Sequence, residues 1–190
     1  MLAALLFSSA AIANDTNYFA GASLGYSDVN VNQNDQLNSI ILGNKIDENG
    51  YNIAIEGGYH YCDKIDFTLN YQRVVLNDVY LNNVYASTQY KFDKIWKYIP
   101  YAGVNLGLSQ LHWSKKPLNT INNDYYSSSY LIGVSAGLLF PLENNFTLKI
   151  DYQLNHMDHT TNIDDPSAKS EILHGISNHV SIGLRYDFNL

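Results

Sequence analysis

The sequence predicts an all-β protein, an eight-stranded antiparallel up-and-down transmembrane β-barrel. Three observations lead to this prediction. Apolar residues alternate with polar or small residues in eight stretches of the chain, which is the period of a strand with two different faces. These stretches approach or exceed the roughly 9–11 residues that a tilted strand needs to cross hydrocarbon. The connections between them alternate between short and long, as in barrels with short periplasmic turns and long extracellular loops.

The first four stretches show the alternation in different residue types. YFAGASLGYSD (18–28) sets Tyr, Ala and Leu against Gly and Ser, and YNIAIEGGYHY (51–61) sets Tyr and Ile mainly against Asn, Glu, Gly and His. FTLNYQRVV (67–75) and VYASTQYKF (84–92) continue the pattern with Thr, Asn, Gln, Ser and Lys on the polar face. Each stretch therefore predicts a strand with one apolar face and one polar face.

The last four stretches repeat the pattern as far as the C-terminus. YIPYAGVNLGLSQL (98–111) carries a proline near its start, where a missing N–H is tolerated. YLIGVSAGLLF (130–140) and FTLKIDYQL (146–154) precede HVSIGLRYDFNL (179–190), which alternates to the end of the chain. A regular terminal strand is what closing a barrel requires, because it must pair with the first strand to leave no edge in lipid.

The connections and the two faces favour a membrane barrel over a soluble barrel of the lipocalin kind. The short connections are 62–65, 93–97 and 141–145, and the outer ones are 30–49, 112–127, 156–174 and the short 76–80. A soluble barrel would bury its apolar face around a ligand. Here Tyr and Phe gather near the strand ends of the apolar face, with aliphatic residues between them, as in two interfacial girdles around a lipid band.

Composition limits the function classes further. The 190 residues are enough for one domain. A net charge of −7, with only 11 Lys and Arg residues along the chain, argues against nucleic-acid binding. The apolar start, ending in Ala11-Ile12-Ala13, predicts a signal peptide over 1–13 that is truncated at its N-terminus, because no basic residue precedes the apolar run. We expect residues 14–190 to form the barrel domain.

Several segments resemble the eight-stranded outer-membrane β-barrel family, the OmpA-like and opacity-type surface proteins of Gram-negative bacteria. They are PYAGVNLGLS (100–109), YLIGVSAGLLFPL (130–142), NFTLKIDYQL (145–154) and VSIGLRYDF (180–188). The resemblance implies a monomer in the cell outer membrane, in contact with outer-membrane lipid and lipopolysaccharide. It also implies an assembly signal in the final strand that the barrel-assembly machinery reads, formed here by Leu184, Tyr186, Phe188 and Leu190, with Leu in place of the usual terminal aromatic residue.

The polar face carries charges that should meet inside the barrel. We predict that Glu56, Lys149, Asp151 and Arg185 form an ion-pair cluster that closes the lumen, as the resemblance to OmpA-like barrels also suggests. An unpaired charge in a narrow lumen would be costly. The alternative is that lumen water solvates each of these charges separately.

No cofactor, metal site or catalytic residue is predicted, and we expect a non-enzymatic protein with a structural, surface-interaction or adhesion role. Host or cell-surface ligands would contact the polar loops 30–49, 112–127 and 156–174. A narrow pore for small solutes or ions is one alternative. A lipid A-modifying enzyme is another, since His179 and Ser181 have the spacing of the His-x-Ser pair in lipid A deacylases. Their parity, however, points both side chains into the lumen, away from lipid.

Overall fold

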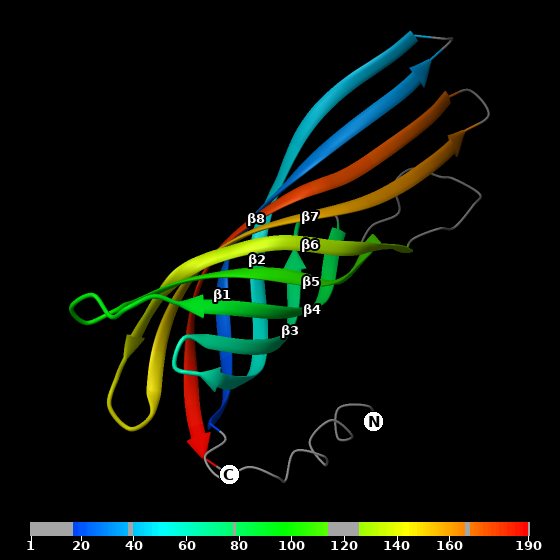
Figure 1. The fold of residues 1–190 in the computed structure, drawn as a ribbon. Coiled ribbons are helices and arrows are strands. Elements are labelled where there is room, and N and C mark those ends of the chain that lie inside the picture. Colours follow the sequence, from blue (N-terminus) through cyan, green and yellow to red (C-terminus); the bar gives the residue numbers. More distant parts are fainter. Residues whose placement is uncertain (1–16, 38–39, 78, 114–125, 166–167, 190) are drawn as a thin grey trace.

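The computed structural model describes residues 17–37, 40–77, 79–113, 126–165 and 168–189. It contains eight strands and no helix in these ranges (Figure 1). The strands are β1 (Asn17–Leu37), β2 (Ile40–Cys62), β3 (Ile65–Val75), β4 (Val79–Lys91), β5 (Ile99–Trp113), β6 (Tyr126–Pro141), β7 (Phe146–Asp165) and β8 (Ala168–Asn189). Among the described residues, no helix is long and apolar enough to cross a membrane.

The strands close into a barrel in chain order, and every neighbouring pair is antiparallel. The closing ladder joins β1 to β8 and sets Tyr18 opposite Phe188 and Leu24 opposite Ile182. The predicted fold class is thus confirmed, including the role of the last strand as the seam. Every strand has two neighbours within the barrel, so no sheet edge is left in the hydrocarbon region.

The two faces of the wall are those predicted from the alternation. Large apolar side chains point outward and are exposed, among them Leu24, Ile53 and Leu106 at 55–65%. Aromatic rings gather at the end that carries the short turns. They are in contact there in the pairs Tyr18–Tyr59 (ring centroids 5.6 Å apart), Tyr90–Phe92 (5.2 Å) and Phe146–Tyr186 (5.0 Å). An exposed apolar band edged by aromatic rings is the surface that a bilayer solvates.

The wall has unequal height at the end opposite the short turns. β1, β2, β7 and β8 rise above the other strands as two long hairpins (Figure 1). The β2–β3 ladder ends at Tyr51 opposite Val75, and the β6–β7 ladder ends at Leu131 opposite Met157. Above these two points β1, β2, β7 and β8 continue as a four-stranded sheet outside the barrel.

Two predicted loops are therefore corrected. The segments 30–49 and 156–174 consist largely of paired strand, because the backbone N–H and C=O groups pair whether or not the side chains alternate. In the third predicted loop, 112–127, strand structure reaches Trp113 and resumes at Tyr126. The remainder of that loop, the predicted signal peptide 1–13 and Leu190 lie outside the described residues.

Candidate functional site

Four charged side chains from three strands meet in the lower half of the lumen, toward the short turns. Arg185 on β8 donates from Nε to Oε1 of Glu56 on β2 (2.5 Å) and from Nη2 to Oε2 (3.2 Å). Lys149 on β7 donates from Nζ to Oε2 of the same carboxylate (3.0 Å) and lies 3.9 Å from Asp151 Oδ2. All four side chains are at most 9% exposed. The structure thus brings together the four residues that the sequence singled out.

The cluster extends further toward the turns through a carboxylate that the sequence reasoning missed. Asp66 is fully buried, and its Oδ1 lies 2.7 Å from Lys91 Nζ and 2.6 Å from His60 Nδ1. Its Oδ2 lies 3.6 Å from Arg185 Nη1, which joins it to the first four charges. The other imidazole nitrogen of His60 lies 3.2 Å from Asp187 Oδ1. A strand beginning at Ile65, two residues before the predicted start, is what places Asp66 on the inner face.

Neutral groups complete the lower layer. Tyr101 donates its hydroxyl hydrogen to Asp151, and Gln89 accepts from Arg185 Nη2 at 2.8 Å. The ring of Phe19 lies under the guanidinium, 4.5 Å from the Arg185 carbon to the ring centroid. Gly58 makes room for this ring, because a Cβ there would lie 2.2 Å from a Phe19 ring atom. The lower layer is therefore packed as well as charged.

A second layer, in the upper part of the lumen, is apolar. It consists of Val29, Val74, Leu76, Val79, Leu81, Leu111, Leu131 and Met157, each at most 6% exposed, which form one buried cluster together with Tyr85. The alternation predicts a polar lumen throughout, so this apolar layer differs from the prediction. The sequence feature that indicates this layer is the run RVVLNDVYL at 73–81, where apolar residues occur on both faces of the two strands.

Between the two layers lies a polar layer that includes His179. Its Nδ1 lies 2.6 Å from the Ser27 hydroxyl oxygen and its Nε2 lies 3.0 Å from the Ser177 hydroxyl oxygen. Ser27 also accepts a hydrogen bond from Asn52 (2.8 Å). Both imidazole nitrogens are thus engaged with serines other than Ser181. His179 is 1% exposed and Ser181 9%, so both residues of the proposed His-x-Ser pair face the lumen interior.

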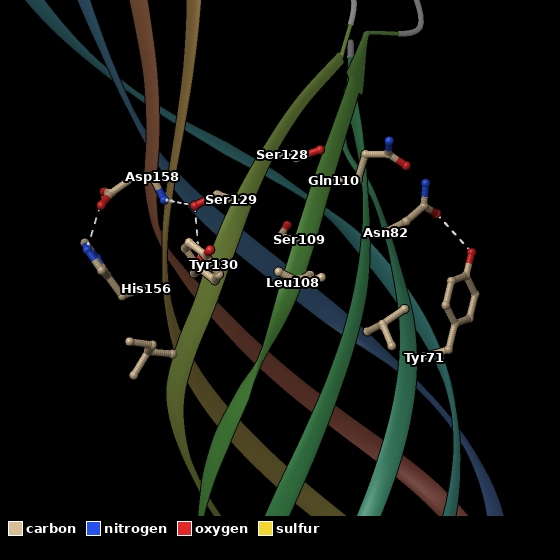
Figure 2. Close-up of a pocket in the computed structure, with 12 residues that line it drawn as sticks. Tyr71, Asn82, Leu108, Ser109, Gln110, Ser128, Ser129, Tyr130, His156 and Asp158 are labelled. Carbon is tan, nitrogen blue, oxygen red and sulfur yellow. Dashed lines mark hydrogen bonds and ion pairs between the residues drawn. The ribbon is translucent and has the colours of Figure 1, made fainter. Parts of the chain in front are cut away.

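A groove of about 1240 Å³ lies on the outer wall, beside the point where β6 and β7 separate (Figure 2). Its polar lining includes Tyr71, which donates to Asn82 Oδ1 (3.0 Å), and His156, whose Nε2 lies 3.4 Å from Asp158 Oδ1. Ser129 bridges the gap between the two strands by accepting from the backbone N–H of Asp158 (2.8 Å).

The other residues that line the groove are continuous with the lipid-facing band. They include no lysine or arginine. Val84, Leu108 and Ile132 line it and are exposed on the outer wall. Within the described part of the chain, no group of three or more His, Cys, Asp or Glu residues is placed to hold a metal ion.

Comparison with solved structures finds barrels of the same shape. Neisserial surface protein A (NspA) is 20% identical, with a TM-score of 0.64 over 90% of this chain and 97% of that one. The outer membrane protein OprG from Pseudomonas aeruginosa is 13% identical, with a TM-score of 0.61 over 92% and 96%. The outer membrane protein AlkL, solved in DMPC lipid bilayers, is 18% identical, with a TM-score of 0.54 over 96% and 95%. At these identities the likeness shows the fold.

A search of curated proteins finds no match to this chain. A family model described as "Opacity family porin protein" matches residues 50–188, which include seven of the eight strands in whole or part. The family and the architecture together place the protein in the outer membrane of a Gram-negative bacterium. The chain belongs to the opacity family of porin proteins.

Proposed function

We propose that this protein is a non-enzymatic surface protein whose barrel serves as the membrane anchor and whose extracellular strands make the contacts. The observation that supports this proposal is the packing of the lumen at two levels, one charged and one apolar. A barrel that is filled in this way offers its outer wall and its extracellular end for interaction. The four strands that rise above the wall supply an extended surface there.

The charged layer acts as an ion-pair plug in this proposal. Its side chains are almost fully buried, which favours mutual pairing over separate solvation by lumen water. Because Glu56 accepts from both Arg185 and Lys149, each charge has a partner of opposite sign within 4 Å. The apolar layer above it adds a region that an ion could enter only by losing its hydration.

The pore alternative predicts a different result in planar bilayers. We expect purified, refolded protein to give no steady single-channel conductance, because both layers block the lumen. A steady conductance that scales with salt concentration would contradict the plug and favour the pore.

The lipid A-modifying alternative has little support from the geometry. His179 bonds to Ser27 and Ser177 within a buried layer, whereas a lipid substrate would approach the outer wall. We expect mass spectra of lipid A from expressing and non-expressing cells to be the same. A shift by an acyl chain in expressing cells would overturn the non-enzymatic proposal.

Outer-membrane lipid and lipopolysaccharide are the first partners that we propose. The groove beside β6 and β7 has an apolar lining continuous with the lipid-facing band, together with hydroxyl, amide and imidazole groups (Figure 2). This arrangement suits an amphiphile whose chain lies along the wall and whose head group meets the polar lining.

A surface role is tested by shortening the two long hairpins to the height of β3–β6 in cells that display the protein. We expect adhesion to epithelial cells or to immobilised matrix proteins to fall, while the amount of folded barrel stays constant. The control is a variant with a substituted β6–β7 turn, which lies at the opposite end of the barrel. Equal adhesion by all three proteins would refute the surface role without affecting the fold.

A further inference from the structure

A strained hairpin tip projects from the short-turn end of the barrel between β4 and β5 (Figure 1). Ile95 and Tyr98 exchange two backbone hydrogen bonds of 2.9 and 3.1 Å, which leaves Trp96 and Lys97 as a two-residue turn. The φ angle of Trp96 is +60°, a region that a bulky L-residue rarely adopts. A two-residue turn with positive φ at its first position favours glycine there.

Among the described residues, little packs against the indole ring in return for this strain. Trp96 is 89% exposed, and its neighbour Ile95 is 53% exposed. Strain that persists without internal compensation points to an interaction outside the chain. The exposed pair at the tip is therefore a candidate contact for another component of the cell envelope.

The charges around the tip narrow the choice of partner. Lys94 and Lys97 flank the exposed pair, and neither has an ion-pair partner among the described side chains. The one acid in this hairpin, Asp93, is 2.9 Å from Lys64 of the neighbouring turn and is neutralised by it. The tip thus presents an indole ring between two uncompensated ammonium groups.

The height of the tip fits the lipid head groups. The aromatic pairs Tyr90–Phe92 and Tyr98–Phe140, with centroids 5.2 and 5.9 Å apart, mark the edge of the apolar band on these strands, and Trp96 lies just beyond them. Tryptophan favours the boundary between hydrocarbon and water, and lysines beside it are attracted to anionic lipid.

We propose that the β4–β5 hairpin is an anchor that binds anionic phospholipid head groups in the periplasmic leaflet, with Trp96 inserted at the interface and Lys94 and Lys97 contacting the phosphates. This contact is on the opposite side of the membrane from the surface role and is independent of it. It would hold the barrel at a fixed depth and select the lipids around one part of its rim.

The chain has only two tryptophans, which makes the test direct. In a Trp113→Phe background, Trp96 is the sole indole fluorophore. The protein is placed in phosphatidylcholine nanodiscs that contain the same small fraction of a lipid with brominated chains, either phosphatidylglycerol or phosphatidylcholine. Bromine quenches indole emission on contact, so the two samples differ only in the head group that carries the quencher.

We expect brominated phosphatidylglycerol to be enriched at Trp96 by at least roughly fivefold, the factor that each lysine contributes near anionic lipid. The Lys94→Gln/Lys97→Gln variant should lose this preference. The matched control, Lys64→Gln/Asp93→Asn, removes two charges from the same end without changing the net charge and should keep it. Heat-modifiable gel mobility checks that all three are folded.

Two results would overturn the proposal. Equal quenching by both brominated lipids would show that the tip does not select anionic head groups. Emission from Trp96 that is characteristic of water, with no quenching by either lipid, would show that the tip stays out of the bilayer and that a protein or glycan partner has to be sought instead.

Discussion

Replacing Arg185 with methionine tests the ion-pair plug most directly. The substitution keeps much of the side-chain volume, but it removes both hydrogen bonds to Glu56, the hydrogen bond to Gln89 and the cation–π interaction with the Phe19 ring. Breaking a buried pair by removing one partner costs about 3–5 kcal/mol, because the other charge is left uncompensated. Since Lys149 still lies 3.0 Å from Glu56, we expect the lower end of this range.

The free energy of unfolding is measured by urea titration of the refolded barrel in micelles, followed by far-UV circular dichroism. The matched control is Arg73→Met. Arg73 is exposed on β3 and lies 4.3 Å from the Tyr80 ring centroid. Its loss should cost less than about 1 kcal/mol, the value of an exposed cation–π contact.

A double variant separates pairing from simple packing. Glu56→Leu/Arg185→Met removes one charge of each sign and leaves Lys149 3.9 Å from Asp151. We expect it to recover about 1–2 kcal/mol relative to Arg185→Met, because coupled partners are not additive. If Arg185→Met costs no more than Arg73→Met, or if the double variant costs the sum of the two single ones, the lumen charges are solvated separately and the plug is refuted.

Four further substitutions address other parts of the molecule. Met157→Ala should destabilise the barrel by about 2–5 kcal/mol in the same urea titration, because it leaves a cavity in the apolar layer. Gly58→Ala should cost about 1–3 kcal/mol, since the new methyl group overlaps the Phe19 ring; an unchanged midpoint would contradict this close packing. Trp96→Gly should stabilise the barrel by about 1 kcal/mol in non-ionic micelles, where no anionic lipid offsets the strained φ. Leu190→Phe should raise the fraction of folded protein in outer membranes of expressing cells, measured by unboiled gel mobility, if the terminal residue limits recognition by the assembly machinery.

The alternation of the sequence was sufficient to place most side chains on the correct face of the wall. Leu24 and Ile182 point outward and Arg185 inward because, within the membrane, each face has a single environment, and a period of two records it. The four-residue charge cluster followed from the same parity, since a narrow barrel leaves inward charges little choice but to meet. The alternation alone could not identify which residue pairs with Arg185, because its contact with Glu56 forms only when the barrel closes.

Three features were not predicted from the sequence, each for a physical reason. The hairpins continue beyond the part of the sequence that alternates, and without alternation the sequence predicts a loop at 30–49. The apolar layer was not predicted because Val74 and Leu81 face inward while their neighbours Val75 and Tyr80, on the outer face, are apolar or aromatic too. A run of this kind shows no alternation. Asp66 was missed because a strand boundary shifted by two residues decides whether it is read as turn or as lumen.

The β1–β8 seam has a consequence for the order of folding. Its ladder joins Asn17 to Asn189, so β1 gains its second neighbour only when β8 is in place. Contacts between such distant parts of a chain form slowly, because a long loop must close before any of them is made. Until then, β1 and β7 each have an unpaired edge, which lipid cannot satisfy and another strand could occupy. The interval between the first strand pairing and the closure of the β1–β8 seam is therefore the period in which this protein is most exposed to misassembly.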